Sequence, residues 1–234
     1  RTGKKINTYN FAVSGMTSMA SNNIMLNKVI PFDVDIAIKM HNINDLSTLY
    51  YTGTYWNQSN RTLLAKKGKN TLLDWTKDQI KQVLPNIYSL VKNAVFVQEQ
   101  DEWADYRDFA AEVEDQFVLN QFKASLKTFI NICRAWEIKP VIMTQPNRFP
   151  ITEELLNAPF YQPTDYSRYR DIYLKMNDII RQTANEKEVL LIELEQSVPK
   201  DTLHLIDLVH LNDQGSIRAG DVITDSLEYF IQTL

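Results

Sequence analysis

Short apolar runs alternate with longer amphipathic segments along most of this chain. The runs are rich in Ile, Val, Leu and Met, as in strands covered on both faces, and they occupy residues 33–40, 139–146 and 189–194. Segments with helical spacing of apolar residues accompany them, at residues 118–138, 169–188 and 212–234. Parallel strands need crossover connections, which such helices supply. The sequence therefore predicts an α/β protein, a parallel sheet with helices on both faces.

The N-terminal part continues this alternation, and the middle interrupts it. Ile6–Val13 is rich in β-forming residues and predicts a strand, which a helix at residues 16–29 follows, ending before Pro31. Residues 46–118 are less regular and include a proline-interrupted helical stretch. We interpret them as an insertion. The length of 234 residues then fits a single domain, residues 1–234, with an insertion at about 46–118.

Composition excludes several classes of function. The formal net charge is −4, and no basic stripe is present, so nucleic acid is not a predicted partner. The glycines form no GxGxxG motif, and the three histidines show no HExxH spacing, so neither a cofactor nor a metal is predicted. Cys133 is the single cysteine, so it cannot form an internal disulfide. No apolar run is long enough to cross a bilayer.

Functional residues are expected where strands end, because ligands of parallel sheets bind beyond the carboxyl ends of the strands. The segments at these positions are Ser14-Gly15, His41–Asp45, Thr144–Arg148 and the stretch before the last helix. In that last stretch Asp207 stands three residues before His210. A carboxylate that orients an imidazole is part of a serine-hydrolase triad, although the same spacing also arises by chance or in a surface cap.

Three of these segments together resemble a known family. The stretches "VSGMTS", "HNIND" and "DLVHLNDQG" occur in the order of the second, third and fifth sequence blocks of the SGNH/GDSL serine esterases. The resemblance covers most of the chain outside residues 50–118. It implies a flavodoxin-like α/β/α sandwich, with strand order 2-1-3-4-5. It also implies that Gly15 and Asn44 supply oxyanion-hole donors, and that Asp207 and His210 are the acid and base.

The chain departs from the family pattern in two places. Asn42 stands where the third block usually has Gly. The first block, Gly-Asp-Ser, supplies the nucleophile after the first strand, and no such block is present. We therefore expect the first strand and its Ser upstream of residue 1, either continuous with the chain or held non-covalently. Ser14 does not fit a nucleophile elbow, which needs Gly where Ala12 and Met16 stand.

The resemblance implies hydrolysis of carboxylic esters, namely acyl or acetyl groups on a lipid or carbohydrate. An O-acyltransferase would use the same groups. Two non-catalytic functions also fit the sequence: a glycan-binding module with a degenerate site, and an interaction subunit that uses residues 46–118. His41 and His204 are interpreted as structural or surface histidines.

Overall fold

Three parallel strands form the centre of the protein in the computed structural model, which describes residues 3, 5–56, 112–150 and 165–232. The strands are β1 (Ile36–Met40), β2 (Lys139–Met143) and β3 (Leu190–Ile192). Their order in the sheet is β1-β2-β3, and each pairs with its neighbour in parallel. All three lie inside the predicted apolar runs, so the predicted α/β class with a parallel sheet is confirmed.

Helices form at the four predicted helical segments, 16–29, 118–138, 169–188 and 212–234, and two further α-helices were not predicted. They are α1 (Ser18–Ile24), α2 (Ile43–Thr52), α6 (Asp115–Ala135), α7 (Tyr166–Lys187), α8 (Leu194–Ser197) and α9 (Asp213–Gln232). Helix α1 continues as a π-helical turn (Met25–Val29) and a 3-10 turn (Ile30–Phe32). Pro31 lies at the start of this last turn, where its missing N–H costs least, so it does not end the helical segment before residue 31 as predicted.

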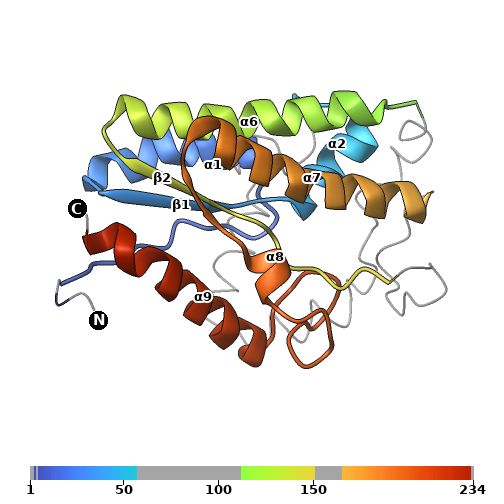
Figure 1. The fold of residues 1–234 in the computed structure, drawn as a ribbon. Coiled ribbons are helices and arrows are strands. Elements are labelled where there is room, and N and C mark those ends of the chain that lie inside the picture. Colours follow the sequence, from blue (N-terminus) through green and yellow to red (C-terminus); the bar gives the residue numbers. More distant parts are fainter. Residues whose placement is uncertain (1–2, 4, 57–111, 151–164, 233–234) are drawn as a thin grey trace, which may run out of the picture.

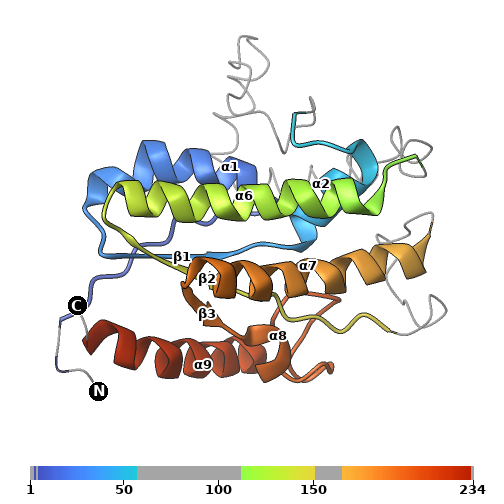
Figure 2. The same ribbon diagram turned by 45° about the horizontal axis from the view of Figure 1, so that its top comes forward.

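Helices cover both faces of the sheet. Figure 1 shows α1, α6 and α7 on one side and α9 on the other. Ala37 and Ile142 point into the core beneath α6 and α7, whereas Val141 and Ile192 belong to a second core beneath α9. Because side chains alternate along a strand, these two cores use opposite faces of the same strands. Figure 2 shows α6 and α7 side by side along their face of the sheet.

The predicted strand at Ile6–Val13 is wrong. Residues 5–13 form no regular secondary structure, and most of them are exposed. A strand is stabilised by hydrogen bonds to a neighbour, and no backbone hydrogen bond joins residues 5–13 to β1 within the described part of the chain. Among the described residues, no strand pairs with the outer edge of β1. Ile38, in the middle of β1, is 42% exposed.

The two described ends of the predicted insertion are part of the core. Leu46 and Leu49 of α2 are fully buried, and α2 contacts both α6 and α7. Val118 at the start of α6 is also fully buried. The remainder of the predicted insertion, residues 57–111, lies outside the described residues. Across the described ranges, we find no helix with both the length and the apolarity required to cross a membrane.

Candidate functional site

The segments that follow the three strands gather at one end of the sheet. In Figure 1 the strands point toward the end where α8 and the loop between α8 and α9 lie. Met40 leads into α2, Met143 leads into the loop 144–150, and Ile192 leads into α8. Two of the predicted segments, His41–Asp45 and Thr144–Arg148, therefore follow strands at the same edge of the sheet, where parallel α/β proteins bind their ligands.

Asp207 and His210 are in direct contact in the loop between α8 and α9. Asp207 Oδ2 lies 2.7 Å from His210 Nδ1. Its Oδ1 accepts the backbone N–H groups of Val209 and His210, each at 2.9 Å. This contact places a proton on Nδ1 of the neutral imidazole and leaves Nε2 as the basic nitrogen. The side chain of His210 is 71% exposed, so Nε2 is accessible.

The same hydrogen bonds act on the ionisation of Asp207. Partial burial raises the pKa of this carboxyl, but the N–H groups of Val209 and His210 and the His210 ring outweigh it, so the pKa lies below the usual 3.8. The carboxylate is therefore ionised at neutral pH. An ionised Asp on Nδ1 stabilises the imidazolium that forms when Nε2 takes a proton.

Arg148, in the loop after β2, holds the turn that carries this pair. Its Nε donates to the carbonyl oxygen of Asp207 at 2.6 Å, and its Nη2 donates to that of Ile206 at 3.1 Å. Its backbone N–H donates to the carbonyl oxygen of Leu208 at 2.9 Å. The sequence alone did not reveal this role, because Arg148 and Asp207 are 59 residues apart.

Gly15 and Asn44 are brought next to each other. Gly15 has a φ of +76°, a conformation that glycine adopts without strain, in the turn before α1. The Asn44 side-chain amide, in the first turn of α2, donates to the carbonyl oxygen of Met16 at 3.2 Å. This hydrogen bond joins the turn that carries Gly15 to the start of α2, which carries Asn44. Asn42, the departure from the family pattern, directs its amide to the Tyr173 carbonyl oxygen.

The loop after β2 connects the two halves of the site. At one end Gln145 Oε1 accepts the backbone N–H of Ile43, next to Asn44, at 2.9 Å. At the other end Arg148 bonds the Asp207 turn. A single loop at the sheet edge therefore bonds the residue before Asn44 and the turn that carries Asp207.

Another Asp-x-x-His turn, Asp201–His204, comes just before the Asp207–His210 turn in the chain. Asp201 Oδ1 lies 2.8 Å from His204 Nδ1, the same arrangement as in the Asp207–His210 pair. His204 is less accessible, since its side chain is 21% exposed. The repeated spacing is visible in the sequence and could have been found there. It provides an internal comparison for the chemistry of His210.

Buried charges around α1 and α2 were missed by the sequence reasoning. The Asp45 carboxylate is fully buried and accepts the Ser18 backbone N–H at 2.9 Å and the Tyr55 hydroxyl at 2.5 Å. His41 Nδ1 lies 3.4 Å from the same carboxylate. Burial raises the pKa of Asp45, but hydrogen bonds and charge from His41, with the hydroxyls of Ser18 and Tyr55, bring the pKa below 3.8. Lys39 is buried nearby.

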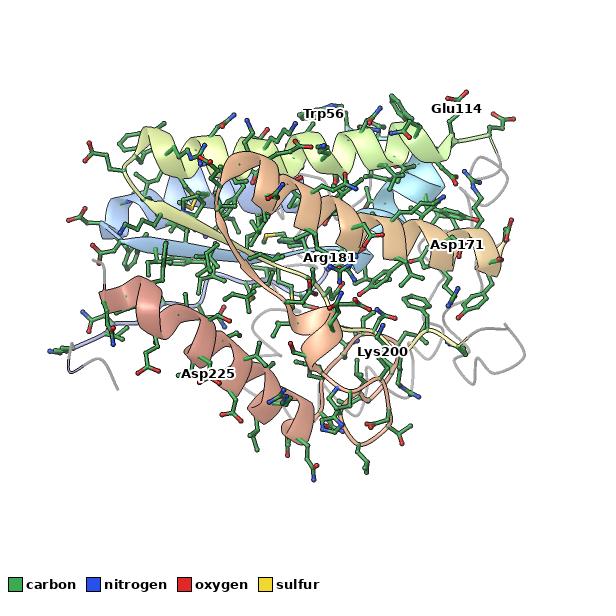
Figure 3. All side chains as sticks on the ribbon, viewed as in Figure 1. Trp56, Glu114, Asp171, Arg181, Lys200 and Asp225 are labelled. Atoms are coloured by element: carbon green, nitrogen blue, oxygen red, sulfur yellow. The ribbon has the colours of Figure 1, made fainter. Side chains whose placement is uncertain are left out.

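A second charged cluster lies at the end of β3. Arg181 and Lys200, labelled in Figure 3, come from α7 and from the loop after α8. Arg181 bonds Glu193 at 2.7 Å and Glu195 at 2.6 Å, and Lys200 also bonds Glu195. The hydrogen bonds that Arg181 donates to Glu193 raise the pKa of Arg181, so the guanidinium keeps its charge. Because Arg181 and Lys200 both bond Glu195, this cluster links α7 to the loop that contains Asp201.

The described residues do not contain a complete triad. No serine hydroxyl of residues 5–56, 112–150 or 165–232 is hydrogen-bonded to His210, and Ser14 is exposed in its turn. In the same ranges no group of three or more His, Cys, Asp or Glu side chains could hold a metal ion.

Comparisons with known proteins agree with the fold. No protein-family model matches the chain, and no curated protein matches it. One similar solved structure is a mutant of an acetyl-xylooligosaccharide esterase from Geobacillus Stearmophilus. The two share 13% sequence identity with a TM-score of 0.50, over 92% of this chain and 68% of the other. At this identity the likeness shows the fold alone: the α/β arrangement of this chain is one that an esterase also uses.

Proposed function

We propose that this chain is the acid–base and oxyanion part of an SGNH/GDSL-type serine esterase that hydrolyses acyl or acetyl esters of a carbohydrate or lipid. The observation that carries the proposal is the 2.7 Å contact between Asp207 and His210 at the sheet edge that also holds Gly15 and Asn44. The proposal is further supported by the likeness in fold to an acetyl-xylooligosaccharide esterase.

Each group has a defined role in the proposed reaction. A serine hydroxyl attacks the ester carbonyl carbon while His210 Nε2 takes its proton. The backbone N–H of Gly15 and the amide of Asn44 donate to the oxyanion, each contributing on the order of 3 kcal/mol to the transition state. His210 then protonates the leaving alcohol. Water, activated by the same imidazole, cleaves the acyl–serine bond, releases the acid and restores the hydroxyl.

The proposed serine lies on a strand that adds to the open edge of β1. In a flavodoxin-like sheet the first strand is internal and pairs with the strand that β1 represents. The uncovered edge and the 42% exposure of Ile38 support a missing neighbour, since an unpaired edge strand with an exposed apolar side chain favours pairing. In this proposal the strand belongs to a segment upstream of residue 1. The chain itself is a single domain with an insertion at about 46–118.

A fluorophosphonate probe tests the proposal, because it reacts only with an activated serine. The protein should be labelled as isolated from its source, digested and mapped by mass spectrometry. We expect the label on a serine of a Gly-Asp-Ser sequence upstream of residue 1. Label on Ser14 would move the nucleophile into this chain. No label at all would refute the esterase function and favour a non-catalytic glycan-binding module.

The repeated Asp-x-x-His turn supplies a matched control. His210→Ala should abolish labelling, because the serine then has no base. His204→Ala removes the same side chain from a turn of the same geometry, so it should label at the wild-type rate. Equal labelling of both variants would refute the role of His210, and loss of label only in His204→Ala would assign the base to the other pair.

A further inference from the structure

The buried carboxylate of Asp45 joins the segment that carries Gly15 to the segment that carries Asn44, the first turn of α2. Ser18 is the first residue of α1, three residues after Gly15, and Asp45 is in the first turn of α2, directly after Asn44. Both Asp45 oxygens accept the Ser18 N–H, at 2.9 and 3.1 Å, and the Ser18 hydroxyl also donates to Oδ1. One side chain thus fixes the starts of two helices against each other.

The amide of Asn44 forms a second link between the same loops. It donates to the carbonyl oxygen of Met16 at 3.2 Å, one residue after Gly15. The Asn44–Met16 and Asp45–Ser18 bonds are successive links between two short segments. Together they set the distance and angle between the backbone N–H of Gly15 and the amide of Asn44.

The cost of burying Asp45 argues for a role beyond stability. Its side chain has no exposure to solvent, and a buried carboxylate carries a desolvation cost that packed apolar residues avoid. Its partners come from three directions: Ser18 on α1, His41 after β1, and Tyr55 after α2, whose hydroxyl donates at 2.5 Å. A carboxylate that accepts several donors at once imposes one arrangement, which apolar packing does not.

We propose that Asp45 is a positioning residue that sets the geometry of the oxyanion hole formed by Gly15 and Asn44. This inference rests on the proposed esterase function. Asp45 does not touch the substrate; it acts through the two donors on either side of it. Preorganised donors stabilise the transition state only when they are held close to the productive geometry.

Asp45→Asn tests the proposal with little change in volume. The new amide group would face at least one donor among Ser18 N–H, the Tyr55 hydroxyl and the His41 ring, so the link between the loops weakens. With the protein that carries the proposed serine segment and para-nitrophenyl acetate as substrate, we expect kcat to fall about 10- to 100-fold. KM should stay within about twofold, because the oxyanion forms only in the transition state.

Two further variants separate positioning from folding. Asp115→Asn is the matched control: Asp115 is also a first-turn acid of a helix, and it bonds Arg168 of α7 at 2.7 Å. It should leave kcat and KM unchanged. Tyr55→Phe removes one hydroxyl donor from Asp45 and should fold, with a decrease in kcat of about threefold or more at constant KM. If Asp45→Asn does not fold, the kinetics of Tyr55→Phe test whether Asp45 positions the oxyanion hole.

Hydrogen exchange gives a readout that needs no activity. The Ser18 amide proton, bonded to Asp45, should exchange at least about tenfold faster in Asp45→Asn and at the wild-type rate in Asp115→Asn. If the wild-type protein neither hydrolyses para-nitrophenyl acetate nor reacts with the fluorophosphonate, the esterase function is refuted. Hydrogen exchange at Ser18 then remains as the test of whether Asp45 links the two segments. The positioning role is refuted by unchanged kcat, by activity that falls only with the folded fraction, or by unchanged exchange at Ser18.

Discussion

Replacing Lys39 should change how stability depends on pH. The Lys39 ammonium is buried on β1 and donates to the Ser18 carbonyl oxygen at 2.9 Å and to Asn22 Oδ1 at 2.7 Å. Burial lowers the pKa of Lys39 from 10.5 to about 7, although the negative charge of Asp45 opposes the shift. The unfolded chain therefore binds a proton at Lys39 over a range where the folded protein has released it.

The sign and size of the effect follow from this difference. Where the unfolded state binds more protons, the free energy of unfolding rises with pH. With a pKa of about 7 in the folded protein and 10.5 in the unfolded chain, Lys39 should add about 2 kcal/mol to it between about pH 7 and about pH 9. The gain should be absent in Lys39→Met, which keeps the length of the side chain and removes its proton.

The free energy of unfolding at each pH can be measured by urea denaturation, with tryptophan fluorescence as the signal and the ionic strength held constant. Burial raises the pKa of the Cys133 thiol from 9.0 to about 12, so ionisation of the unfolded thiol opposes the gain at higher pH, and the series should stop near about pH 9. Subtracting the Lys39→Met series from the wild type removes most of this shared contribution.

The control is Lys139→Met, which alters a partly exposed lysine on the neighbouring strand. Its ammonium lies 5.3 Å from the centre of the Phe230 ring, much as Lys39 lies 5.0 Å from that of Phe129. The wild type and Lys139→Met should show parallel pH profiles. A constant difference between the wild type and Lys39→Met across the range would refute the reasoning, because it would mean that Lys39 stays protonated in the folded protein.

Three further predictions concern packing and the site. Phe122→Ala, at a fully buried position of α6, should lower the free energy of unfolding by about 3–5 kcal/mol in the same urea assay. Gly215→Ala should lower it by about 1–3 kcal/mol, because the added Cβ would overlap the carbonyl oxygen of His204. Arg148→Lys should slow fluorophosphonate labelling about tenfold with a melting temperature close to the wild type, because lysine cannot bond both carbonyl oxygens that Arg148 holds in the turn of Asp207; unchanged labelling would contradict this role.

Features that depend on nearby residues could be predicted from the sequence. The strands at residues 36–40, 139–143 and 190–192 carry their apolar signal within themselves, and so do the helices that connect them. The Asp207–His210 contact is equally local, since a three-residue spacing closes it. The N-terminus of α9 is local in the same way, because the Asn212 side chain accepts the Gly215 N–H at 3.0 Å, as a helix N-cap does.

The prediction of a strand at Ile6–Val13 was wrong because a composition rich in β-forming residues is not sufficient to form a strand. Its residues favour extended backbone, but a strand also needs a neighbour to accept its hydrogen bonds, and none is described beside residues 5–13. The sequence of a segment cannot report whether its partner is present. The same open edge of β1 that leaves this segment unpaired is the place where we expect the serine-bearing strand.

Polar contacts between residues far apart in the chain could not be predicted from the sequence, for a different reason. Asp45 and Ser18 are 27 residues apart, and each has an ordinary local interpretation as a residue at the start of a helix. Lys39 is the one local signal: it is a lysine within "IAIKM", a run that otherwise predicts a strand covered on both faces. A charge at such a position requires buried partners of its own. Those partners are the Ser18 carbonyl oxygen and Asn22 Oδ1, 21 and 17 residues away on α1, and the N–H of the same Ser18 is bonded to Asp45.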